Sequence, residues 1–143
     1  MVGAVAALTV LTAGPAGAVI PVSVAAGTPS WASSQLKASG SFKNNATVAA
    51  TYSYTLQLVR TSTASKPSCT TASGCVTVNS QVLLNKVTSS VSVAKSSTYT
   101  LPTLAVNCAA GTTTRYYWSW LKVADSSGNV VTSVSSYIAG KYC

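Results

Sequence analysis

The sequence predicts an all-β protein, an antiparallel β-sandwich of seven to eight strands. Along most of the chain, apolar residues alternate with Ser and Thr, which is the pattern of strands with one buried and one solvated face. Gly and Pro interrupt this pattern at intervals, as expected for turns between short strands. No segment of comparable length has the 3.6-residue apolar period of an amphipathic helix.

The N-terminal segment is uncharged and mostly small and apolar up to Ala26. A transmembrane helix needs about 20 uninterrupted apolar residues, whereas Gly and Pro interrupt this segment from position 14 onward. A secretory signal needs about 7–15 apolar residues followed by small residues at a cleavage site, and residues 2–12 and 16–18 supply these although no Lys or Arg follows Met1. We therefore predict a signal peptide over residues 1–18, no integral membrane span, and one secreted domain over residues 19–143.

The first predicted strand, 19–25, ends at the turn signal 27–30 (GTPS). The third, 47–61, alternates Tyr52 and Tyr54 with polar residues and is long enough to suggest a bulge. In residues 76–84 most apolar residues fall on even positions, and in residues 86–94 most fall on odd positions. This change of parity predicts two separate strands. In chain order the predicted strands span 19–25, 35–43, 47–61, 76–84, 86–94, 97–105, 113–124 and 129–139, and the main loops span 27–30, 62–75, 106–112 and 125–128.

The chain has four cysteines, Cys69, Cys75, Cys108 and Cys143. In an exported chain an even number of cysteines indicates disulfides, here two, and three pairings are possible. We favour Cys69–Cys75, which closes a short loop, and Cys108–Cys143, which ties the last residue of the sequence to the body of the domain. A zinc site would need metal-type spacing in a reducing compartment, so no metal is expected.

Residues 115–138 (RYYWSWLKVADSSGNVVTSVSSYI) combine an aromatic strand, an Asp-x-x-Gly-Asn turn and a Val/Thr/Ser-rich strand. This arrangement resembles the last hairpin of bacterial extracellular immunoglobulin-like and fibronectin-III-like domains. The resemblance implies an immunoglobulin-like sandwich used for display or binding, and it carries over no functional residues.

The charged residues argue against catalysis. The chain has nine Lys and Arg, one acidic residue (Asp125) and no His, for a net charge of +8. General acid–base catalysis depends mainly on His or carboxylates, and carboxylate-pair mechanisms need two acids. We therefore predict no enzyme activity, no catalytic residues and no cofactor. The basic residues are dispersed, which also disfavours a nucleic-acid partner.

Five residues of the 113–124 strand are candidate binding residues: Arg115, Tyr116, Trp118, Trp120 and Lys122. The three aromatic residues share one face of the strand, and the other face is also apolar. One interpretation is a central strand whose second face lies under a loop or another subunit. The other is an exposed aromatic surface, flanked by Arg115 and Lys122, of the kind that stacks on sugars or anchors protein contacts.

We expect a secreted, non-enzymatic protein that binds an anionic polymer, a glycan or a protein at or outside the cell surface. One alternative is self-assembly as a structural subunit of a fibre or coat, because the apolar segment 19–27 could pair with the sheet edge of a neighbouring copy. A third is a small inhibitor of an extracellular enzyme that presents the 62–75 loop, since a constrained loop on a rigid scaffold loses little entropy on binding.

Overall fold

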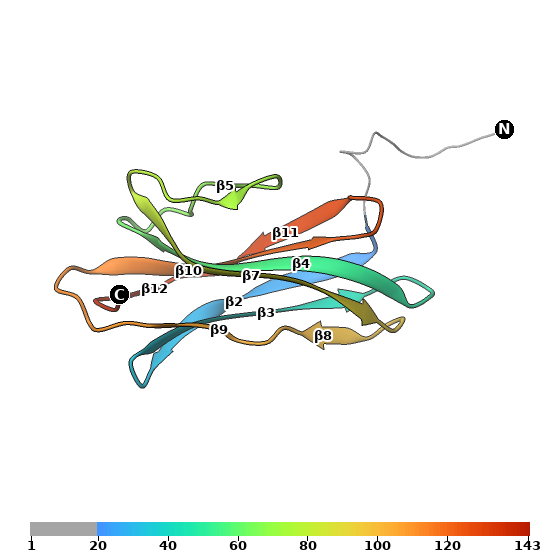
Figure 1. The fold of residues 1–143 in the computed structure, drawn as a ribbon, viewed down its shortest axis with the longest axis horizontal. Helices are drawn as coiled ribbons and strands as arrows, with labels where there is room; N and C mark the ends of the chain where they lie inside the picture. Colours follow the sequence, from blue (N-terminus) through green and yellow to red (C-terminus); the bar gives the residue numbers. More distant parts are fainter. Residues whose placement is uncertain (1–19) are drawn as a thin grey trace.

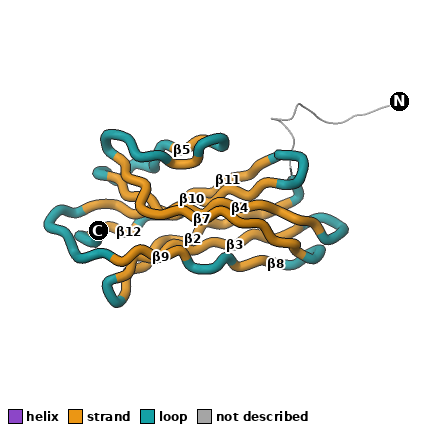
Figure 2. The backbone as a smooth tube through the Cα atoms, in the orientation of Figure 1, coloured by secondary structure: helices purple, strands orange, loops and turns teal. Residues whose placement is uncertain are grey.

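In the computed structural model, residues 20–143 are described, and they form two antiparallel sheets packed face to face, with a small hairpin outside them (Figures 1 and 2). The predicted all-β sandwich is confirmed, and so are both predicted disulfides, Cys69–Cys75 and Cys108–Cys143. The predicted signal peptide lies outside the described residues. Within them, no helix is long and apolar enough to span a membrane.

The first sheet is built around the aromatic strand. Its order is β11–β10–β4–β7, and β12 pairs with the same edge of β10 as β11 does, at the opposite end. The strands are β4 (Ala50–Thr61), β7 (Gln81–Val93), β10 (Arg115–Ala124), β11 (Val130–Val134) and β12 (Ile138–Gly140).

The second sheet has the order β2–β3–β8, with β9 pairing the other half of the same β3 edge. Several side-chain bonds connect the two sheets, including those that Asn44 of β3 makes with Val93 and Tyr52. Ser133 of β11 accepts a bond from the Ala26 main-chain N–H (3.2 Å), and the Asn85 amide of β7 donates to the Ala105 carbonyl (2.9 Å). The strands are β2 (Val22–Ala32), β3 (Gln35–Asn44), β8 (Thr98–Thr100) and β9 (Leu104–Asn107).

The core lies between the two sheets and is made by the alternating residues that the sequence pattern predicts. Tyr117, Leu121 and Val123 of β10 are fully buried there, opposite Leu36 and Phe42 of β3. The side chains at Tyr116, Trp118, Trp120 and Lys122 therefore project from the other side of the sheet.

Two predicted strands, 76–84 and 86–94, are in fact one. β7 runs unbroken from Gln81 to Val93, and its register pairs Leu58 with Asn85 but Val59 with Leu83. Leu84 is thus an extra residue in β7, and this bulge shifts the apolar parity that suggested two strands. The bulge expected in the 47–61 strand lies in its partner instead.

Three other predicted boundaries are wrong. Residues 27–30 are not a loop but lie within β2, where the register with β3 shifts between Gly27 and Ser30. The predicted 97–105 strand is divided into β8 and β9, and the predicted 129–139 strand into β11 and β12. In both cases a short segment outside the regular strand pairing separates the two pieces, which follow different halves of one neighbouring strand.

The segment expected to pair with a neighbouring copy is used within the chain. Residues 22–27 pair in register with β3, from Val22 opposite Asn44 to Gly27 opposite Ser39. Ile20 is also buried. This segment is therefore part of an edge strand of the second sheet, and its pairing with another copy stays a prediction.

Tyr117 carries a buried hydroxyl that makes no hydrogen bond, although the main chain of Tyr142 lies close to it. Burial raises the pKa of this hydroxyl above 10, against a smaller opposing effect of Arg60 and Arg115. A raised folded-state pKa means that the folded state keeps its proton when the unfolded state loses it. The resulting stability is present below pH about 10 and is lost as the pH rises from there.

We expect Tyr117→Phe to leave the free energy of unfolding at pH 7 unchanged or about 1 kcal/mol higher, because it removes a buried polar group that has no partner. Above pH about 10 the variant should lose stability less steeply than the wild type. Urea unfolding measured between pH 7 and 11 checks both statements. A variant that is less stable at neutral pH, with an unchanged alkaline slope, would contradict them.

Candidate binding site

Residues 62–75 fold back over the outer face of the first sheet, where we call them the capping segment (Figure 1). The segment ends in a two-strand hairpin, β5 (Cys69–Thr70) and β6 (Gly74–Cys75), in which the two disulfide-bonded cysteines face each other. Gly74 has a φ of 69°, a backbone conformation that favours glycine. A Cβ there would also lie 2.7 Å from the Gln57 side chain, so the segment approaches the sheet closely.

Gln57 of β4 fixes the capping segment to the sheet. Its buried amide accepts a bond from the Cys75 main-chain N–H (2.7 Å) and donates one to the Cys75 carbonyl (3.1 Å). Gln81 makes the same kind of paired contact with Ser68, through bonds of 2.7 and 2.9 Å. Two glutamine side chains thus do for this segment what a neighbouring strand does in a sheet.

We expect Gln57→Leu to lower the free energy of unfolding by about 2–4 kcal/mol, since it leaves two buried main-chain groups of Cys75 without partners. The matched control is Gln35→Leu, because the Gln35 amide bonds Asn107 at an exposed position. That change should cost less than about 1 kcal/mol. Equal losses in the two variants, measured by urea unfolding, would show that the Gln57 contacts do not hold the capping segment.

The capping segment covers the aromatic face of β10. Trp120 packs against Val59 and Cys75 and is 5% exposed, and Trp118 is 3% exposed. The Trp118 indole N–H donates to the Thr61 hydroxyl at 2.9 Å. Of the two interpretations of this strand, the structure shows the covered one, because the loop that follows β4 turns back onto its own sheet.

The other candidate residues are dispersed around this covered face. Tyr116 packs edge-on against Tyr137, with ring centroids 5.1 Å apart. Lys122 donates to the Thr71 carbonyl (2.9 Å) and so holds the capping segment. Arg115 does not flank the aromatic residues, because alternation along the strand places its side chain on the Tyr117 side of the sheet. A binding role for these residues stays a prediction.

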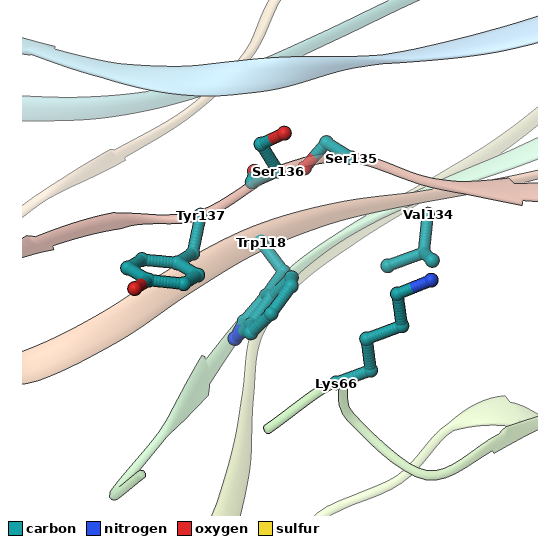
Figure 3. A pocket seen from close by; sticks show the side chains of 6 residues that line it. All are labelled: Lys66, Trp118, Val134, Ser135, Ser136 and Tyr137. Carbon is teal, nitrogen blue, oxygen red and sulfur yellow. Dashed lines mark hydrogen bonds between the residues drawn. The ribbon is translucent and has the colours of Figure 1, made fainter. Parts of the chain in front are cut away.

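Beside the capping segment the structure has an open groove of about 580 Å³, which we call the Tyr137 groove (Figure 3). Figure 3 shows the Tyr137 and Trp118 rings next to each other on one side and the Lys66 side chain reaching in beside Val134. The ring centroids of Trp118 and Tyr137 are 5.1 Å apart, and Tyr137 is 41% exposed. The lining residues are Lys66, Trp118, Val134, Ser135, Ser136 and Tyr137.

Sequence reasoning missed Tyr137 and Lys66. Tyr137 falls inside the predicted strand 129–139, but the chain leaves β11 after Val134 and joins β12 only at Ile138. The intervening residues, 135–137, turn the tyrosine ring outward. An isolated large aromatic residue in a run of serines was the available signal.

The Tyr137 groove presents one exposed aromatic ring and a few polar groups. An aromatic ring, one ammonium group and the hydroxyl of Ser136 are available, while Ser135 already accepts a bond from the Ser119 N–H and donates to the Ser136 carbonyl. No titratable acid lines the groove. Among residues 20–143, no three His, Cys, Asp or Glu side chains lie together as metal ligands would.

Comparison with known proteins assigns no family, since no family model and no curated protein matches the sequence. Among solved structures, β-glucuronidase 2 of Bacteroides uniformis is 16% identical with a TM-score of 0.47, over 84% of this chain and 13% of that one. A second β-glucuronidase structure from B. uniformis is 13% identical with a TM-score of 0.44, over 85% of this chain and 15% of that one. The chain thus spans about a seventh of the length of these enzymes.

Proposed function

We propose that this protein is a secreted, non-enzymatic sandwich of immunoglobulin-like type that binds an extracellular glycan in the Tyr137 groove. The supporting observation is the exposed Tyr137 ring, which stands beside Lys66 and the Ser136 hydroxyl in that groove. The two disulfides are compatible with an oxidising, extracellular compartment.

The groove offers the contacts that a sugar unit uses. An aromatic ring provides a flat apolar surface for the C–H face of the sugar, and hydroxyl and ammonium groups pair with its polar edge. Lys66 and the net charge of +8 also favour a glycan that carries acidic substituents. An anionic polymer without sugar rings would use the charge but not the ring.

The rigidity of the groove supports affinity. Trp118 is fixed by its bond to Thr61, and the capping segment that carries Lys66 is closed by Cys69–Cys75 and held by Gln57. A surface that is already ordered loses little entropy when it binds.

Retention on immobilised extracellular polysaccharides tests the proposal. We expect Tyr137→Ala to weaken retention about tenfold or more, because aromatic anchors often contribute more than 1 kcal/mol. Tyr137→Phe should keep most of the binding since it keeps the ring. Val78→Ala is the matched control, because Val78 is similarly exposed, at 49%, but lies outside the groove.

Three results would overturn the proposal. One is unchanged retention in Tyr137→Ala, and another is no retention of the wild type on any polysaccharide. The third is retention that salt abolishes equally in every variant, which would assign binding to the diffuse positive charge alone.

A further inference from the structure

The chain has seven lysines but only two arginines, Arg60 and Arg115. They are far apart in the sequence, yet the fold brings them to one end of the sandwich. Arg60 of β4 is opposite Tyr117 in the register with β10, and Arg115 lies two residues before Tyr117 on the same side of the sheet. Both line the same two small hollows, of about 90 and 170 Å³. We call them the arginine pair.

No side-chain carboxylate neutralises this pair. The single acidic residue of the sequence, Asp125, follows the opposite end of β10. Its carboxylate is occupied within its own turn, where it accepts bonds from the Ser127 and Asn129 main-chain N–H groups at 2.9 Å. Both arginines therefore line the same hollows with no acidic side chain among the lining residues.

Most of the N–H donors of the arginine pair are available. Arg60 donates to the main-chain oxygen of Cys143 through one nitrogen (2.7 Å). Arg115 makes only a long contact of 3.4 Å with the carbonyl of the preceding residue, Thr114. Each guanidinium group carries five donors in a planar fork. Several N–H donors of Arg60 and Arg115 can therefore bind a ligand.

The walls of the hollows add neutral donors. Ser62, Asn79 and Ser80 line the smaller hollow, and Thr112 and Thr113 line the larger one. Hydroxyl and amide groups can complete the coordination of an anion that two guanidinium groups hold.

We propose that the arginine pair binds one tetrahedral oxyanion, a sulfate or phosphate group, at this end of the sandwich. Planar guanidinium forks match the oxygens of such groups in pairs, which an ammonium group cannot do. The two arginines of the chain, whose other basic residues are all lysines, lie where such paired binding would need them. The site shares no residue with the Tyr137 groove and does not depend on the function proposed for it.

Both guanidinium groups also act on the Tyr117 hydroxyl, whose pKa they lower while burial raises it more strongly. This places both positive charges near one point of the structure, in agreement with the two shared hollows.

The test is a titration of the ¹⁵N-labelled protein with sodium sulfate, and then with sodium phosphate, followed by NMR. Because the chain has two arginines, the arginine Nε–Hε region contains two side-chain signals. We expect both to move along saturable curves at millimolar sulfate and phosphate, but not with sodium chloride of equal ionic strength.

Two variants distinguish bidentate binding by the guanidinium group from the general effect of positive charge. Arg115→Lys keeps the net charge and should weaken sulfate binding about tenfold, since it removes a bidentate donor. Lys95→Gln removes one charge at an exposed turn and should bind sulfate as the wild type does. Tyr137→Ala should also leave sulfate binding unchanged, which distinguishes this site from the groove.

Movement of the wild-type signals that does not saturate, or that chloride reproduces, would overturn the proposal whatever the variants do. It would mean that main-chain atoms near Cys143 and Thr114 already satisfy both groups. Equal sulfate affinity of a folded Arg115→Lys variant would overturn it as well.

Discussion

Replacing Trp120 by Ala is expected to lower the free energy of unfolding by about 3–5 kcal/mol, the usual cost of emptying a buried aromatic site. The indole is 5% exposed and is the largest side chain of the small apolar cluster under the capping segment. Val59 and Cys75 contact it from the sheet and from the hairpin. Its removal opens a cavity between the sheet and the hairpin.

Urea unfolding of Trp120→Ala measures this effect. Thr132→Ala is the control, because Thr132 is exposed on the neighbouring strand and its loss should change stability by less than about 0.5 kcal/mol. In the variant, hydrogen exchange of the Cys75 amide should also become faster, since the capping segment loses its apolar contact. A loss below about 1 kcal/mol would show that the segment does not pack on the indole as described.

Removing the Cys108–Cys143 disulfide, by changing both cysteines to Ser, is expected to cost about 4 kcal/mol. Removing Cys69–Cys75 in the same way should cost about 2 kcal/mol. The two bonds close loops with sequence separations of 35 and 6, and the longer loop restricts the unfolded chain more.

The two double variants are compared by urea unfolding under non-reducing conditions. The larger effect for Cys108–Cys143 depends on chain entropy, and the opposite order would mean that native-state contacts decide. Glycan retention should be lost when Cys69–Cys75 is removed and not when Cys108–Cys143 is removed. The reason is that Cys69–Cys75 closes the hairpin of the capping segment, which carries Lys66 to the Tyr137 groove.

The alternation of apolar and polar residues was sufficient to predict the fold class. Period two is a property of the strand itself, so positions such as Tyr52 and Leu56 face the core whatever the partner strand is. The even number of cysteines likewise predicted two disulfides, and the favoured pairing is the one observed. Strand boundaries were less predictable, because the Leu84 bulge and the breaks after Thr100 and Val134 depend on which neighbour each segment meets.

Alternation could not predict which residues on the outer face of β10 are exposed and which are covered. Alternation places Trp118 and Trp120 on the outer face of β10, but it does not say what lies above that face. The answer came from Gln57 and Gln81, two polar residues whose amides bind the capping segment through main-chain contacts that leave no periodic signal.

The sequence by itself determined the all-β class, the alternating core and a cationic surface with a single acidic group, since each depends on residue type or on short-range spacing. Only the tertiary structure decided that the tryptophans are covered, that Tyr137 and Lys66 share a groove, and that Arg60 and Arg115 line the same hollows. These are contacts between residues distant in the chain, and their geometry follows from strand register and loop path, which local patterns do not specify.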